Sequence, residues 1–270
     1  MLKLLRCVVA SIALGVSGWL HAGVLVQYSY TDPYGQAKTA QPETAAVNPA
    51  GDMAFILAAG IDRRLRITLY RGGTQLATAE SPPLTGADRI TIAGETYYGA
   101  SLVLPAPSLD GPHTLRAEIL SHEGTLITRE ESAVIIDRQP PVLSGGFAYF
   151  SHWGPNNRDP LEPEALVSGY GVGRIIARGV ADAHAGLAID GARFQSIYLE
   201  GPHRGEVAYE TPAVFSGTDL VVGTGNEGSV ARGVHLPVWD GALLLRFVAF
   251  DRAGNAAYFD VQVRFDGEYS

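Results

Sequence analysis

Short apolar runs, separated by clusters of Gly, Pro, Asn and Asp, make up the chain after residue 22. No stretch keeps the helical period of 3.6 residues, whereas many runs are as short as strands and several alternate apolar with polar positions. The pattern predicts strands at residues 23–30, 53–59, 65–70, 75–79, 101–104, 113–120, 126–136, 174–180, 193–199, 207–209, 220–222, 243–250 and 257–265. Many short strands with frequent turn signals favour an all-β sandwich or barrel.

Two segments of the chain share one pattern. Asp110-Gly111 opens an apolar run that turns at Gly124, and Asp240-Gly241 opens another that turns at Gly254, so both landmarks are 130 residues apart. Two matched hairpins at this separation predict two copies of one domain. We place the boundary next to Pro140-Pro141, because adjacent prolines make a short, stiff linker. The expected domains are residues 23–138 and 139–270.

The first 22 residues have the pattern of a secretory signal. Lys3 and Arg6 precede an apolar run over residues 7–16, and small residues lead to Ala22. The alternative is a signal anchor, but the run is shorter than the ~20 apolar residues that a membrane span requires. We therefore expect a signal peptide at residues 1–22, cleavage before Gly23, and a periplasmic or extracellular product with no membrane insertion after cleavage.

Charge and cysteine content exclude several functions. Without residues 1–22 the chain holds 18 basic and 28 acidic residues, a formal charge of −10, and Lys38 is its sole lysine. Nucleic acid is therefore not an expected partner, since phosphate binding depends on clustered Lys and Arg. Cys7 lies in the predicted signal, so disulfides, thiolate zinc sites and a cysteine nucleophile are excluded from the mature protein.

The turn motifs resemble those of bacterial immunoglobulin-like repeats in exported and surface proteins. The residues that carry the resemblance are the Asp-Gly pairs before strands, the turn Asp251-Arg252-Ala253-Gly254-Asn255, and the loop from Asp182 to Leu187. The resemblance implies two tandem immunoglobulin-like β-sandwiches. Such domains serve as spacers, stalks, accessory modules of enzymes or parts of envelope assemblies, and the fold does not choose among these roles.

Calcium is the one cofactor that the sequence suggests. In the expected sandwich, the loops that hold Asp182 and Asp251 lie at the end of the second domain that faces the linker, beside Asp137. Three carboxylates there would supply the hard oxygen ligands that Ca²⁺ prefers. The alternative is that each Asp stabilises its own turn, because Asp readily bonds nearby backbone N–H groups. No calcium loop with alternating acidic residues occurs in the chain.

An aromatic segment at residues 147–157 is the second candidate site. Tyr149, Phe150 and Trp153 would stack on sugar rings or anchor a partner if they lie on an exposed loop. The alternative is a first strand of the second domain, with Phe147 and Tyr149 directed into the core. The segment leaves both interpretations open.

No arrangement of residues predicts catalysis. The chain has no Gly-x-Ser-x-Gly elbow, and its histidines occur singly without the spacing of a zinc site. We therefore expect a non-enzymatic binding or structural module of a bacterial envelope or surface assembly, with protein partners. One alternative is an accessory carbohydrate-binding protein that uses the segment near Trp153. Another is a chaperone of pilus subunits, although the basic residues that such a chaperone uses are not identifiable here.

Overall fold

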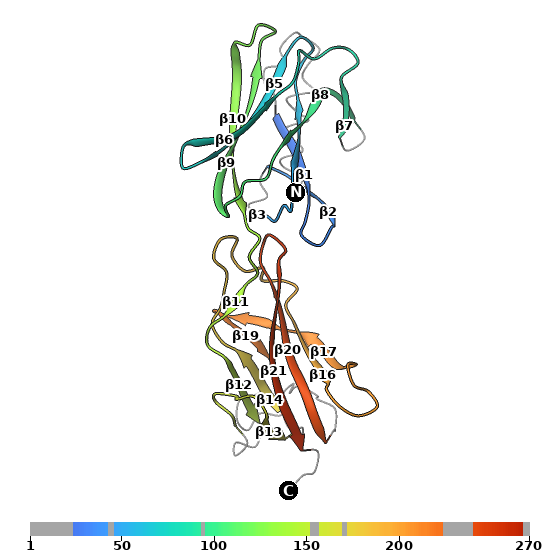
Figure 1. Ribbon diagram of the computed structural model, residues 1–270, viewed down its shortest axis with the longest axis vertical. Coiled ribbons are helices and arrows are strands. Elements are labelled where there is room, and N and C mark those ends of the chain that lie inside the picture. Colours follow the sequence, from blue (N-terminus) through green and yellow to red (C-terminus); the bar gives the residue numbers. More distant parts are fainter. Residues whose placement is uncertain are drawn as a thin grey trace. The chain divides into compact units, whose positions relative to one another are not determined.

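A computed structural model describes residues 24–42, 46–92, 95–151, 157–168, 172–223 and 240–266. The chain divides between Arg138 and Gln139 into two compact units, Met1–Arg138 and Gln139–Ser270. Both units consist of strands arranged in layers, and the described residues form no helix (Figure 1). It follows that no helix in this part of the chain is long and apolar enough to cross a membrane.

The first unit is a sandwich of two five-stranded sheets, with strand orders β2-β1-β4-β8-β7 and β3-β10-β9-β5-β6. The short strand β3 pairs in parallel with β10, and the other pairs are antiparallel. The strands are β1 (Val24–Thr31), β2 (Ala37–Ala40), β3 (Ala46–Val47), β4 (Met53–Ala58), β5 (Arg64–Arg71), β6 (Thr74–Glu80), β7 (Arg89–Ile92), β8 (Glu95–Leu104), β9 (Gly111–Leu120) and β10 (Leu126–Ile136).

The second unit combines a four-stranded sheet, β12-β14-β19-β18, with a five-stranded sheet, β13-β21-β20-β16-β17. A two-stranded sheet, β11-β15, completes it. The strands are β11 (Val142–Leu143), β12 (Phe147–Ser151), β13 (Ala165–Ser168), β14 (Val172–Ala177), β15 (Val180–Ala181), β16 (Arg193–Tyr198), β17 (Val207–Pro212), β18 (Val214–Ser216), β19 (Asp219–Val222), β20 (Gly241–Phe250) and β21 (Ala256–Asp266).

The two units have equivalent strand orders. β3-β10-β9-β5-β6 of the first unit corresponds to β13-β21-β20-β16-β17 of the second, and both contain one parallel pair at the same place. β20 and β21 begin and end 130 residues after β9 and β10, as with Gly111 and Gly241 or Ile136 and Asp266. The two hairpins predicted from this offset therefore occupy the same place in their sheets, and the all-β immunoglobulin-like sandwich is confirmed.

The Asp-Gly pairs make the turns into β9 and β20. Gly111 and Gly241 have φ values of 112° and 148°, which residues with a Cβ rarely adopt. The Asp110 carboxylate accepts hydrogen bonds from Arg138, from Nη1 at 2.6 Å and from the backbone N–H at 3.3 Å. This pair therefore fastens the start of β9 to the chain that follows β10.

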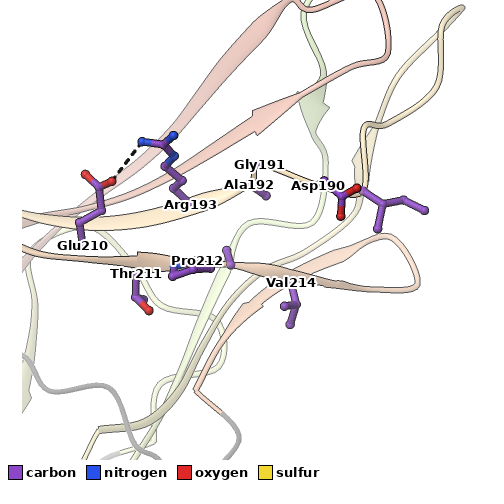
Figure 2. A pocket seen from close by; sticks show the side chains of 10 residues that line it. Asp190, Gly191, Ala192, Arg193, Glu210, Thr211, Pro212 and Val214 are labelled. Atoms are coloured by element: carbon purple, nitrogen blue, oxygen red, sulfur yellow. Dashed lines mark hydrogen bonds and ion pairs between the residues drawn. The ribbon is translucent and has the colours of Figure 1, made fainter. Parts of the chain in front are cut away.

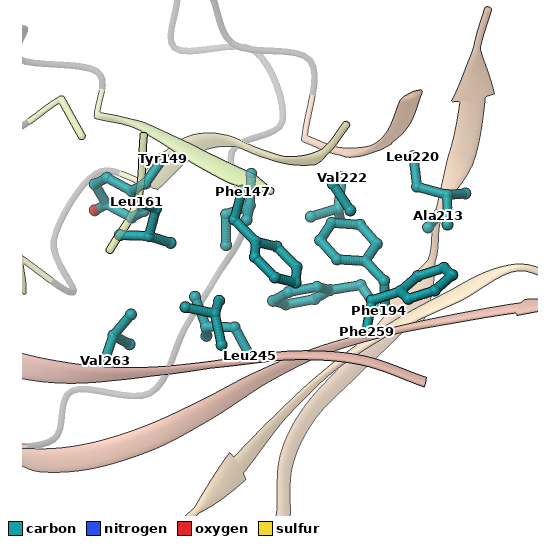
Figure 3. Packing of buried hydrophobic residues seen from close by; sticks show 14 of the residues in the cluster. Phe147, Tyr149, Leu161, Phe194, Ala213, Leu220, Val222, Leu245, Phe259 and Val263 are labelled. Atoms are coloured by element: carbon teal, nitrogen blue, oxygen red, sulfur yellow. The ribbon is translucent and has the colours of Figure 1, made fainter. Parts of the chain in front are cut away.

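Aromatic and branched side chains fill the space between the sheets of the second unit (Figure 3). Along β20, Leu243, Leu245 and Phe247 are fully buried at every second position, as the pleat of a strand requires. The Phe247 ring meets the edge of Phe194 on β16 at 5.1 Å and stacks on Phe147 at 6.4 Å. Phe247 thus connects the two layers.

Replacement of Phe247 by Ala is expected to destabilise the second unit by about 3–5 kcal/mol, because it leaves a cavity between the sheets. Urea unfolding followed by tyrosine fluorescence measures the loss. Val207→Ala on the exposed edge of the same sheet is the control, with an expected change of about 0.5 kcal/mol or less. Equal stability of Phe247→Ala and the wild type would contradict this description of the core.

Candidate functional site

The outer strands of the described sheets are each modified in a way that hinders the addition of another strand. β6 and β17 contain a bulge in their pairing, and β17 ends at Pro212, which has no N–H to donate. β2 carries Lys38 at its second position, and β18 has three residues. Exposed edges managed in this way resist edge-to-edge pairing. A partner of these units is therefore better placed on a sheet face or in a groove.

The outer side of β12 is covered by its own chain. Tyr149 and Arg158 exchange two backbone hydrogen bonds of 2.9 Å, and Leu161 N–H donates to the carbonyl of Phe147 at 2.7 Å. These bonds occupy the backbone groups that an incoming strand would use.

A groove of about 510 Å³ opens where β17 leaves one sheet and continues as β18 in the other. Ala213 joins the two strands, and its N–H donates to the carbonyl of Ala192 at 3.0 Å. The groove residues come from two segments, 189–193 and 210–214. Arg193 and Glu210, joined by an ion pair of 3.2 Å, lie at one end of the view in Figure 2, and Asp190 and Val214 lie at the other.

The groove has an apolar part that is open to solvent. Ile189 and Val214 are 71% and 60% exposed, and both line the groove together with Pro212. Exposed apolar side chains that gather beside a concave surface favour an interaction site over a plain surface. We refer to segments 189–193 and 210–214 as the corner groove.

The outer face of sheet β3-β10-β9-β5-β6 in the first unit is, by contrast, closed by ion pairs. Arg66 bonds Glu80 at 2.7 Å and Glu118 at 3.4 Å, and Arg64 bonds Glu80 at 3.2 Å. Although burial opposes it, the hydrogen bonds from Arg66 and Arg64 lower the pKa of the Glu80 carboxyl. Surface pairs of this kind contribute little stability. They do satisfy the charges of Arg64 and Arg66, the arginines of the one basic cluster in the sequence.

Tyr149 does not contribute to a binding surface, which corrects one interpretation of the aromatic segment. β12 places Tyr149 and Phe147 in the core, where the Tyr149 side chain is fully buried and burial raises the pKa of its hydroxyl. Phe150 on the same strand is half-buried, and the Arg174 guanidinium lies 4.9 Å from its ring centre. Trp153 lies outside the described residues. The strand interpretation therefore holds for residues 147–151.

The loops that hold Asp182 and Asp251 interlock at one end of the second unit. Arg252 N–H donates to the carbonyl of Gly186 at 2.9 Å, and Leu187 forms a bridge with Asp251. One carboxylate oxygen of Asp182 and one of Asp251 lie within 4.8 Å of each other. The expectation that these two loops meet is confirmed.

Each of these carboxylates also stabilises its own turn. Asp182 Oδ1 accepts from the N–H groups of His184 and Gly186, at 3.1 and 2.6 Å. Asp251 accepts from the backbone N–H and the side-chain amide of Asn255, at 2.9 and 2.6 Å. Asp182 Oδ2 is buried and has no hydrogen-bond partner in the described part of the chain. The turn roles explain three of the four oxygens.

Asp137, the third predicted calcium ligand, directly follows β10 in the first unit. It is buried, and its backbone N–H donates to the carbonyl of Val47 at 2.8 Å. A site that includes all three carboxylates stays a prediction.

His113 is a buried histidine that the sequence did not single out. It lies on β9, is 3% exposed, and its Nδ1 is 2.9 Å from the carbonyl oxygen of Gly111. Because a carbonyl only accepts, Nδ1 must carry the hydrogen, and the buried Nε2 has no hydrogen-bond partner among the described residues. Burial lowers the pKa of His113, and the positive charges of Arg71 and Arg138 act in the same direction, against Gly111 and Asp110.

Reasoning from the sequence did not find the corner groove. Its residues come from a loop and from the junction of two edge strands, which have no regular apolar pattern. The presence of Pro212 next to an apolar run was the one available signal of an edge strand.

Comparison with known proteins gives a family for the first unit. Residues 21–139 match the sequence model of a family described as "Domain of unknown function (DUF4165)". The match covers less than half of the chain, and its description assigns no activity. No curated protein matches the chain.

Solved structures similar to the chain include three bacterial examples. The fibronectin(III)-like modules of Clostridium thermocellum CbhA have 13% identity and a TM-score of 0.36, over 83% of this chain and 90% of that chain. CopC from Methylosinus trichosporium OB3b has 10% identity and a TM-score of 0.26, over 39% and 85%. The C-terminal domain of the Streptococcus pyogenes antigen I/II-family protein AspA has 9% identity and a TM-score of 0.33, over 91% and 100%. The fold description rests on the strand order given above.

Lower pH is expected to destabilise the first unit through His113. The folded protein holds the pKa of His113 below its unfolded value of about 6.5, so the unfolded chain binds the proton first. Stability is therefore unaffected by this group above about pH 6.5 and falls as the pH drops below it.

Chemical unfolding at a series of pH values between 5 and 8 measures this effect. His113→Asn is the matched variant, because its amide can still donate to Gly111 but does not titrate. The variant should lose less stability than the wild type on acidification. An identical pH dependence of the two proteins would show that His113 does not contribute.

Proposed function

We propose that the protein is an exported, non-enzymatic binding module of a bacterial envelope or surface assembly, and that it binds a protein partner through the corner groove. The proposal depends on one observation, the exposed apolar side chains of Ile189 and Val214 on the open groove of the second unit. Export is supported by the signal pattern of residues 1–22.

The chemistry of the groove suits a protein partner. Its apolar part offers a recess for a side chain of the partner, and the polar rim carries Asp190, Arg193 and Glu210. Protein interfaces combine an apolar centre with a polar rim in this way. Because the sheet edges beside the groove are bulged or short, contact through side chains is favoured over strand addition.

Val214→Asp is expected to reduce partner binding at least tenfold, because it places a charge in the apolar part of the groove. Affinity capture from the cell envelope of the native host, followed by mass spectrometry, measures the recovery. Val103→Asp is the control, since Val103 is 53% exposed on β8 of the first unit. Equal recovery of the same proteins by Val214→Asp and the wild type would refute the proposal.

Calcium binding is a second proposed property, favoured by the proximity of Asp182 and Asp251. Two carboxylates within 4.8 Å repel each other, and a divalent cation would neutralise them and occupy the buried Oδ2 of Asp182. The residues present offer hard oxygen ligands, as this cation requires. Binding would hold the two interlocked loops together.

Calcium is expected to raise the thermal midpoint of the protein. A cation at 100 times its dissociation constant adds about 2.7 kcal/mol of stability, which corresponds to several degrees. Melting in CaCl₂ and in excess chelator measures the shift. Asp182→Asn should abolish it and leave the fold intact, because Asn keeps the Oδ1 acceptor of the turn. Identical midpoints for the wild type with and without calcium would exclude the site.

A further inference from the structure

One aromatic side chain on the second unit is both exposed and held in place. Tyr258 on β21 is 61% exposed. Its neighbours Ala257 and Phe259 point into the core, so the alternation of the strand directs Tyr258 to the outer face of sheet β13-β21-β20-β16-β17.

Arg246 on the neighbouring strand β20 fixes one side of the Tyr258 ring. Its guanidinium carbon lies 5.1 Å from the ring centre. The same guanidinium forms two parallel bonds to Asp260, from Nε at 2.8 Å and from Nη2 at 2.7 Å. A bidentate pair of this kind has a defined geometry, so Arg246 is itself immobilised. The ring is therefore supported on one side and presented on the other.

The residues beside Tyr258 form a row across the sheet. Val248 on β20 is opposite Tyr258, and Arg193 on β16 is opposite Val248. Val248 is buried, so it forms an apolar floor between Tyr258 and Arg193. Arg193 in turn pairs with Glu210 on β17 at 3.2 Å. The row thus has an aromatic wall, an apolar floor and a polar wall.

Charges on this face are paired with each other. The parallel row contains Asp260 with Arg246, and Gln195 with Glu210, whose side chains are bonded at 2.7 Å. Each arginine that the two rows contain has a carboxylate partner, so the surface offers planar hydrogen-bonding groups with little net charge. Such a surface suits a neutral ligand that has many hydroxyl groups.

The equivalent position in the first unit is built differently. Arg116 on β9 corresponds to Arg246, and it lies 4.4 Å from the ring centre of Tyr70. Arg116 Nη1 also donates to the Tyr70 hydroxyl at 2.8 Å, and Tyr70 is half-buried. The aromatic ring is held there as well, but it is not presented to solvent as Tyr258 is.

We propose that Tyr258 is a stacking platform for a pyranose ring of a neutral polysaccharide. The apolar C–H face of the sugar would pack on the open side of the ring, over Val248. Its hydroxyl groups would bond Asp260 and Arg246, which are already oriented by each other. A ligand with many negative charges is disfavoured, since the chain has a formal charge of −8.

Affinity electrophoresis in gels that contain one neutral polysaccharide each, namely β-glucan, xylan, mannan or galactan, tests the proposal with the purified full chain. At least one polymer is expected to retard the wild type. Tyr258→Ala should lose the retardation, and Tyr258→Phe should keep it, because stacking needs the ring and not the hydroxyl. Arg246→Ala should weaken it through the loss of ring support.

Tyr34→Ala is the matched control, since Tyr34 is also 61% exposed but belongs to the first unit. Circular dichroism and melting establish that every variant folds. Retardation of the wild type by none of the four polymers, or unchanged retardation of Tyr258→Ala, would overturn the proposal. Loss of a captured envelope protein by Tyr258→Ala, without polysaccharide binding, would assign the face to a protein ligand instead and would also overturn it.

Discussion

Packing of two sheets against one shared apolar layer is the interaction on which the rest of each unit depends. No disulfide holds the sandwiches together, because the chain contains one cysteine. The inward side chains of strands such as β20 provide the cohesion, and burial of apolar area is the dominant favourable term in folding. The outward side chains of the same strands are consequently free to differ between the units without loss of the fold.

The two units use that freedom differently. In the first, the outer face of the five-stranded sheet carries Arg66, Glu80 and Glu118 in mutual contact, and Tyr70 is drawn into a contact with Arg116. In the second, the equivalent face carries the exposed Tyr258, and the neighbouring corner opens into a groove. Equivalent strand orders therefore support a closed surface in one unit and an accessible one in the other.

The sequence predicted the long inner strands well and the short outer ones poorly. The run at 243–250 falls within β20, because alternate burial of Leu243, Leu245 and Phe247 leaves a clear pattern. β2, β7, β13 and β18 were missed, since edge strands of two to four residues are fixed by pairing with a neighbour rather than by their own composition. For the site, turn chemistry correctly brought Asp182 near Asp251. Tyr149 was ambiguous because β12 is buried at successive positions and its aromatic run does not reveal which face is inside.

The position of Lys38 has a practical consequence. After residue 22 it is the only lysine, and it lies on β2 of the first unit with its amine within 3.5 Å of Asp32 Oδ2. Reagents that couple to amines can therefore attach to a single side chain, apart from the chain's α-amine. Dyes, beads or sensor surfaces joined in this way would leave the groove and the Tyr258 face of the second unit chemically unmodified, and all attached molecules would share one tether point.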